Sequence, residues 1–169
     1  MKRLYCPWRK QYSKEVNGTK KEGATSDECV FCAKLSENDD EKNYIIKRFA
    51  HCAVLLNLFP YNAGHVLVIP YRHVACLSDL SEAERAEIME VVSKAVECAK
   101  DALQAQGINV GLNLGRAAGA GIPSHLHMHV LPRWTGDTNF MPLIADSKTV
   151  SFDLNEIYQT LKKAFANLP

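Results

Sequence analysis

Three histidines alternate with apolar residues in one short run, and this run carries the clearest chemical signal in the sequence. His125, His127 and His129 are interleaved with leucine, methionine and valine. Successive side chains of a β-strand point to opposite faces of its sheet, so the alternation predicts a half-buried strand. All three imidazoles would lie on one face, and the apolar partners would point into a core on the other.

Three imidazoles side by side suit three kinds of role. A purely structural role would require a core to satisfy three polar rings together, which is costly. A metal site is the second role, although tandem residues diverge along a strand, so usually only two reach one ion. The third role is nucleophilic catalysis at phosphorus, in which a neutral imidazole attacks while a protonated neighbour and backbone amides hold the phosphoryl oxygens. Histidine suits this work because its ordinary pKa of about 6.5 makes both forms available near pH 7.

A loop rich in glycine and alanine leads directly into the histidine run. It contains Gly115, Gly119 and Gly121. Without side chains at these positions, backbone amides can approach a ligand closely. Bare amides beside a row of imidazoles suit a phosphate group.

A C-x-x-C pair, Cys29 and Cys32, lies well before the histidine run. Zinc sites, redox pairs and chance all produce this spacing. A redox pair is expected within a thioredoxin-like βαβ pattern, and none follows here. A zinc site needs two more ligands, for which His73 and His125 are candidates. The remaining cysteines, Cys6, Cys52, Cys76 and Cys98, are expected to be ordinary thiols.

The strands that must position these residues are predicted by short runs of aliphatic and β-branched residues. Tyr44–Phe49 and Ala53–Leu58 form the first two, and a turn cluster joins the second to His65–Pro70 as a hairpin. Ile108–Leu114 alternates apolar and small polar residues and gives a further strand. Hairpins of this kind predict an antiparallel sheet, not a doubly wound parallel one.

Two helices are expected. Ser78–Gln106 has an apolar stripe at helical period, a capping-box spacing of Ser81 and Glu84, and Gly107 in the place of a left-handed C-cap. Asp153–Asn167 is a shorter amphipathic helix. The fold class is therefore α+β, with an antiparallel sheet of about five strands, one long helix and a short C-terminal helix.

The composition limits the organisation and the partners. Of 169 residues, 47% are hydrophobic, enough for one core, so we expect a single domain over residues 28–169 with a C-terminal extension. Residues 1–27 are expected to form a partly disordered polar arm. The net charge of +1 gives no footprint for a nucleic-acid polymer. The longest apolar run, Cys52–Phe59, is too short for a membrane span, no signal-peptide pattern is visible, and we expect a cytoplasmic protein with reduced thiols.

The histidine run, with Asn113, the glycine loop and the stretch GHVLVIP, resembles the signature of the histidine triad (HIT) superfamily of nucleotide hydrolases and transferases. The similarity covers roughly Cys29–Phe140. The segments PRWTGDTNFMP and LYCPWR most resemble the branch of bacterial diadenosine tetraphosphate phosphorylase-like and fragile-histidine-triad proteins. The resemblance implies a HIT-like fold and cleavage of adenine dinucleoside polyphosphates, by phosphorolysis or hydrolysis, through a covalent nucleotidyl-histidine intermediate.

The resemblance also implies roles for the matching residues. His127 would attack the α-phosphorus, His129 would hydrogen-bond a phosphoryl or bridging oxygen, and His125 completes the triad. Many members carry a glutamine and a serine or threonine just before the triad, where this chain has Gly121–Ser124, so the hydroxyl donor to the phosphate differs. The residues expected to bind the nucleotide are Asn57 at the nucleoside, His65 and Asn113 at the phosphates, and Gly121 and Ser124 in place of the usual donor.

Zinc-bearing members hold the metal with a C-x-x-C pair and two histidines, one of them the first of the triad. Here these are Cys29, Cys32, His73 and His125, a closed set that implies a structural zinc. Members usually dimerise through the helix and an adjacent strand, which implies a homodimer with a small-molecule nucleotide as substrate. Two other functions stay open: a nucleoside phosphoramidase of the same chemistry, and a nucleotide- or metal-binding module without turnover.

Overall fold

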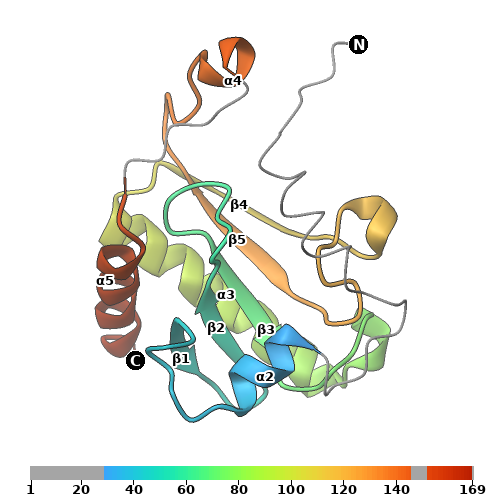
Figure 1. Cartoon of the computed structure of the whole chain (residues 1–169). Coiled ribbons are helices and arrows are strands. Elements are labelled where there is room, and N and C mark those ends of the chain that lie inside the picture. The colour runs from blue at the N-terminus through green and yellow to red at the C-terminus, as the bar shows by residue number, and fades with distance from the viewer. Residues whose placement is uncertain (1–28, 146–151, 169) are drawn as a thin grey trace.

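A five-stranded sheet forms the centre of the computed structural model, which describes residues 29–145 and 152–168 (Figure 1). The strands lie in the order β1-β2-β3-β5-β4, and every neighbouring pair is antiparallel. This confirms the predicted α+β class with an antiparallel sheet. The predicted arm, residues 1–27, lies outside the described residues. The strands are β1 (Ile45–Arg48), β2 (Cys52–Leu56), β3 (Val66–Pro70), β4 (Gly107–Leu112) and β5 (Met128–Arg133).

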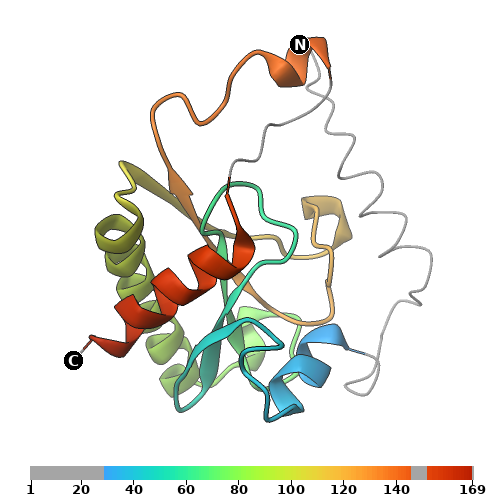
Figure 2. The same cartoon turned by 60° about the vertical axis from the view of Figure 1, so that its left-hand side comes forward.

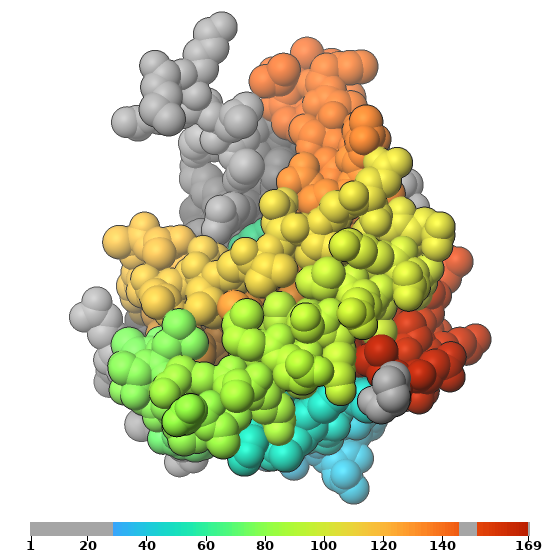
Figure 3. Space-filling view, turned by 180° about the vertical axis from the view of Figure 1, so that it is seen from behind, coloured from blue at the N-terminus to red at the C-terminus, as the bar shows by residue number. Residues whose placement is uncertain are grey.

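The two central strands β2 and β3 are buried on both faces. On one face, α3 (Glu82–Leu103) and α5 (Leu154–Ala166) cover the sheet, and Figures 2 and 3 show these helices from two sides. On the other face, α2 (Val30–Ser36) packs against the sheet. The alternation of side chains accounts for this, because Val54 and Val68 join the α3 core while Leu55 and Leu67 join the α2 core.

The predicted capping box of Ser81 and Glu84 is present at the start of the long helix α3. The helix is nevertheless shorter at both ends than the predicted Ser78–Gln106. Ser81 accepts the backbone N–H of Glu84, and the Glu84 carboxylate accepts the N–H of Ser81. Gln104, not Gly107, takes the left-handed conformation at the C-terminal end, with φ of 52°. Gly107 instead begins β4. No helix in the described part of the chain combines the length and apolar character needed to cross a membrane.

Two short helices, α2 and α4 (Met141–Ile144), were not predicted. Seven residues or fewer are too short to show a clear helical period, so the sequence pattern does not reveal them. The terminal helix α5 agrees with its prediction to within one residue at each end, and Asp153 caps it by accepting the N–H groups of Asn155 and Glu156.

The turn between β2 and β3 delivers His65 to the sheet beside β5. Gly64 has φ of +68°, and a Cβ atom there would overlap the side chain of Leu103. The positive φ favours glycine, and any side chain here would also have to displace the tip of the Leu103 side chain. The residue that follows, His65, is fully buried next to the strand that carries His129.

Candidate active site

The three histidines share one face of the molecule, but only one of them lies in a strand. β5 begins at Met128, so His125 and His127 precede it. The single-strand prediction was wrong here because Leu126 donates its N–H to the carbonyl of Val74 instead of joining the sheet ladder. The alternation still holds, since Leu126 and Val130 point into the α3 core.

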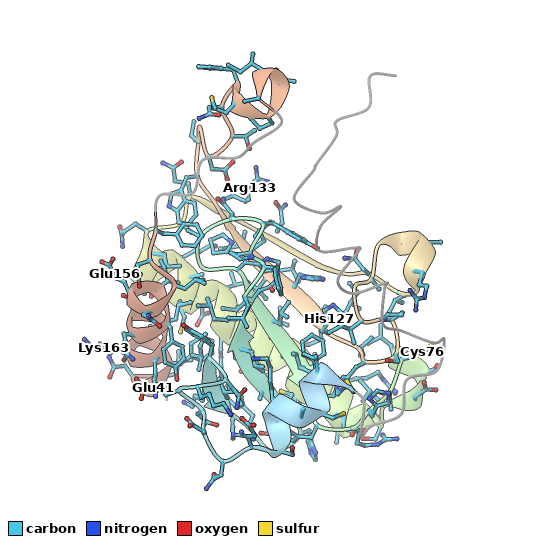
Figure 4. The ribbon with its side chains drawn as sticks, viewed as in Figure 1. Glu41, Cys76, His127, Arg133, Glu156 and Lys163 are labelled. Carbon is cyan, nitrogen blue, oxygen red and sulfur yellow. The ribbon has the colours of Figure 1, made fainter. Side chains whose placement is uncertain are left out.

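His127 is held as a neutral imidazole with one nitrogen fixed as a lone pair. Its Nδ1 lies 2.8 Å from the backbone carbonyl oxygen of His125. A carbonyl only accepts, so Nδ1 carries the proton and Nε2 carries the lone pair. Burial lowers the pKa of His127, against the opposing effect of the bond to His125, and keeps the ring uncharged. Phe31 of α2 packs on this ring, with 5.1 Å between the two ring centroids. Figure 4 labels His127.

His129 lies beside His127 and belongs to a second group of polar side chains. The two rings are 5.0 Å apart between centroids. Nδ1 of His129 is 2.9 Å from Nε2 of His65, and its Nε2 is 3.4 Å from the amide nitrogen of Asn113. The structure therefore brings His65 and Asn113 next to His129. Tyr61, which the sequence did not single out, stacks on His129 at 5.8 Å.

Asn57 reaches this group indirectly, through His65. Its amide nitrogen lies 3.2 Å from Nδ1 of His65, and its Oδ1 accepts the backbone N–H of Phe59 at 3.0 Å. Burial, with smaller contributions from His129 and His127, lowers the pKa of His65 to about 3. His65 is therefore neutral at physiological pH.

The C-x-x-C pair and two histidines converge into one cluster. The ligand atoms of Cys29, Cys32, His73 and His125 all lie within 4.8 Å of one another. Nδ1 of His125 is 3.3 Å from the Cys29 sulfur and 3.5 Å from that of Cys32, and Nδ1 of His73 is 3.3 Å from Cys32. The cysteines meet because one stands at the beginning of α2 and the other one turn later.

The first histidine of the triad has the tautomer that a metal ligand needs. Nε2 of His125 donates to the backbone carbonyl of Pro70 at 2.9 Å, so Nδ1 presents a lone pair to the two sulfurs. Burial lowers the pKa of His125 to about 4, which leaves the ring neutral. Two cysteine sulfurs and two imidazole nitrogens form the donor set of a tetrahedral zinc site.

The glycine loop satisfies part of its backbone by itself. Ala118 and Ala120 both donate to the carbonyl of Gly115, so their amides are turned inward. Gly115 and Gly119 have positive φ values of 78° and 91°, which fold the loop back on itself. Gly121 and Ser124, nearer the triad, make no hydrogen bond to another described residue.

Trp134, the aromatic residue that follows β5, lies away from the histidines. Its Nε1 donates to the backbone carbonyl of Gln104, at the C-terminal end of α3. Among the described residues, the aromatic side chains of Phe31 and Tyr61 contact the triad. Their positions between the two cysteines and inside the hairpin turn were the only signals for them in the sequence.

Comparison with known proteins places this arrangement in a family. The HIT domain matches residues 38–136, more than half of the chain. The chain belongs to the HIT family. The AP-4-A phosphorylase of Mycobacterium tuberculosis is 36% identical over 169 residues, covering all of this chain and 87% of the relative. The asymmetrical bis(5'-nucleosyl)-tetraphosphatase of Schizosaccharomyces pombe is 32% identical over 115 residues, 68% of this chain and 63% of the relative.

Solved structures of HIT proteins share the fold. A Zn-bound histidine triad family protein from Mycobacterium smegmatis superposes with a TM-score of 0.68 at 31% identity, covering 84% of this chain and 96% of the other. A hypothetical histidine triad nucleotide-binding protein from Sulfolobus tokodaii has a TM-score of 0.63 at 32% identity, covering 80% of this chain and 88% of the other. Both matches agree with the five-stranded sheet described above.

The buried histidines make the stability of the HIT fold sensitive to acid. With a folded pKa of about 3 and an unfolded value near 6.5, His65 binds a proton more readily in the unfolded chain. The contribution of neutral His65 to the free energy of unfolding is complete above about pH 6.5. It is lost as the pH falls toward 3, at up to about 1.4 kcal/mol per pH unit. We expect His65→Gln to lower the slope of unfolding free energy against pH between 6 and 5 by about this amount.

Urea unfolding at pH 7, 6 and 5 measures this slope. The matched control is the same substitution at His51, an exposed histidine on the turn before β2. Equal slopes for His65→Gln and the wild type would contradict a neutral, buried His65.

Proposed function

We propose that the protein cleaves adenine dinucleoside polyphosphates such as diadenosine tetraphosphate, through a nucleotidyl group carried on His127 and transferred to inorganic phosphate. The chain is an enzyme of the HIT nucleotide hydrolase or phosphorylase class. The Mycobacterium tuberculosis relative that aligns with all of this chain is named AP-4-A phosphorylase. The observation that carries the mechanism is the bond between His127 Nδ1 and the carbonyl of His125, because it leaves a neutral nucleophilic lone pair on Nε2.

The reaction has two displacements at the same phosphorus. In the first, the Nε2 lone pair forms a bond to the α-phosphorus, and the bond to the bridging oxygen breaks with its electron pair, releasing ATP. In the second, an oxygen of inorganic phosphate attacks, the phosphorus–nitrogen bond breaks, and ADP leaves. Water in place of phosphate would give AMP, which is the hydrolytic outcome.

The phosphate-binding groups in this proposal surround His129. His129 donates to a phosphoryl or bridging oxygen, and Asn113 lies next to its Nε2. Gly121 and Ser124, in the segment just before the triad, supply the backbone amide and hydroxyl that many members provide with other residues. The buried His65 hydrogen-bonds Nδ1 of His129, the ring nitrogen opposite the one that would face the phosphates.

Incubation with diadenosine tetraphosphate, with and without inorganic phosphate, tests the reaction. We expect ADP and ATP to appear only with phosphate, and His127→Ala to lower turnover by at least about 1,000-fold, because the nucleophile is lost. His51→Ala, an exposed histidine, is the matched control. AMP with ATP regardless of phosphate would replace phosphorolysis by hydrolysis, and full activity of His127→Ala would refute the covalent mechanism. No product from the wild type would favour the phosphoramidase or the binding module.

A structural zinc at Cys29, Cys32, His73 and His125 is the second part of the proposal. Two sulfurs and two imidazole nitrogens within 4.8 Å of one another suit this metal, and the histidine triad protein from Mycobacterium smegmatis with the same fold is Zn-bound. The four protein donors would close the coordination shell, so the metal would hold α2 and His125 in place. We place the protein in the cytoplasm, where the thiols stay reduced.

Elemental analysis of the purified protein checks the metal. We expect about one zinc per chain, lost in Cys32→Ser and retained in Cys76→Ser, since Cys76 is an exposed thiol outside the cluster. Zinc removal should also lower the melting temperature of the wild type. Equal zinc content in the two variants would contradict this ligand set.

We also propose a homodimer formed along β4. This strand lies at the edge of the sheet, where its outer backbone groups are available to another strand. Val110 on β4 and Leu114 just after it expose apolar side chains there. Light scattering after size exclusion should give twice the mass of the 18.9 kDa chain, and a monomer at tens of micromolar would rule the dimer out.

A further inference from the structure

The turn before β3 fixes the tautomer of His65. The backbone N–H of Tyr61 and the side-chain amide of Asn57 both lie 3.2 Å from Nδ1 of His65. A backbone N–H can only donate, so Nδ1 must carry a lone pair. The fully buried ring is neutral, and its one proton is therefore on Nε2.

Asn57 is itself oriented by a backbone donor. The N–H of Phe59 donates to Oδ1 of Asn57 at 3.0 Å, which assigns the oxygen end of this carboxamide. The NH₂ end then faces His65 as a second donor to Nδ1. Both ends of the Asn57 side chain are thus used within the protein.

The tautomer of His65 determines that of His129. Nε2 of His65 lies 2.9 Å from Nδ1 of His129, and because the former holds the proton, the latter accepts it. A proton on Nδ1 of His129 would set two donors against each other, so His129 holds its proton on Nε2. The contact of 3.4 Å at this nitrogen joins Nδ2 of Asn113 to Nε2 of His129, so a proton on Nε2 requires the Asn113 carboxamide to be turned over, with its oxygen facing the ring.

We propose that Asn57 is a positioning residue for the reaction, which acts through His65 to hold His129 as a neutral imidazole with its Nε2–H directed at the phosphates. This assignment rests on the proposed function, because it gives His129 a task in that reaction. It differs from the role that the family resemblance implies for Asn57, a direct contact with the nucleoside.

The arrangement also selects the leaving group. His129 donates a hydrogen bond to the leaving oxygen but does not give up its Nε2 proton. To replace that proton, His65 would have to pass its own Nε2 proton to Nδ1 of His129 and gain another at its Nδ1. Nδ1 of His65 already faces two donors and has no source of a proton there. The bridging oxygen therefore departs with its electron pair and no proton, as a polyphosphate does readily near pH 7. An amine must gain a proton on leaving, so the site favours polyphosphates over phosphoramidates.

Nitrogen-15 NMR of histidine-labelled protein without substrate tests the tautomers directly. Assigned through His65→Gln and His129→Gln, both rings of the wild type should show a protonated Nε2 and an unprotonated Nδ1. Asn57→Asp replaces one of the two donors at Nδ1 of His65 by an acceptor and should shift part of the population to a proton on that nitrogen, while the N–H of Tyr61 still favours the lone pair. The matched control, Asn109→Asp on the exposed edge of β4, should leave both rings unchanged.

Kinetics separate positioning from nucleoside binding. In Asn57→Asp we expect kcat to fall about 100-fold, the effect of losing one oriented donor to the phosphates, with KM within about twofold. A protonated Nδ1 on His129 in the wild type would overturn the inference, as would an Asn57→Asp variant with unchanged tautomers and a raised KM alone. The wild-type spectrum decides the question even where the variant does not fold. Expected tautomers without turnover of diadenosine tetraphosphate would refute the proposed function and leave the tautomer assignment standing.

Discussion

The hydrogen bond from His127 Nδ1 to the carbonyl oxygen of His125 sets the chemistry of the whole site. An imidazole free in solution divides its proton between two nitrogens, and this bond removes that choice. The bond depends in turn on where the backbone of His125 lies. That backbone is fixed by a ring that donates to Pro70 at the end of β3 and faces two sulfurs of α2. His125 thus joins His127 to strand β3 and to helix α2.

The two faces of the sheet divide the work between them. The face toward α3 and α5 is apolar and close-packed, with Tyr158, Leu161 and Phe165 of α5 entirely buried. The opposite face carries the histidines, the cysteines and the short helix α2. Buried polar rings are costly unless hydrogen-bonded. Here no buried side-chain nitrogen or oxygen of the described residues lacks a partner, because the histidines satisfy one another and the nearby backbone.

Local patterns in the sequence predicted the residues of the site better than the limits of the elements. The alternation of His125, His127 and His129 and the C-x-x-C spacing are properties of neighbouring residues, and both groups were predicted to form the sites in which they meet. Where β5 begins depends on its pairing with β3 and β4, which no local pattern records. The end of α3 at Gln104 likewise follows from a left-handed residue three positions before the glycine that the pattern favoured. Phe31 and Tyr61 reach the histidines only through tertiary packing.

The brevity of α2 has a consequence for how the molecule opens. A helix of seven residues is far too short to persist alone in water, and only Phe31 and Leu35 of α2 are buried. It therefore forms a small cooperative unit that can detach while β2 and β3, buried on both faces, stay intact. A metal ion bound by its two cysteines would therefore couple its own binding to the folding of this segment. Its loss would loosen the packing of Phe31 on His127 while the sheet stays folded.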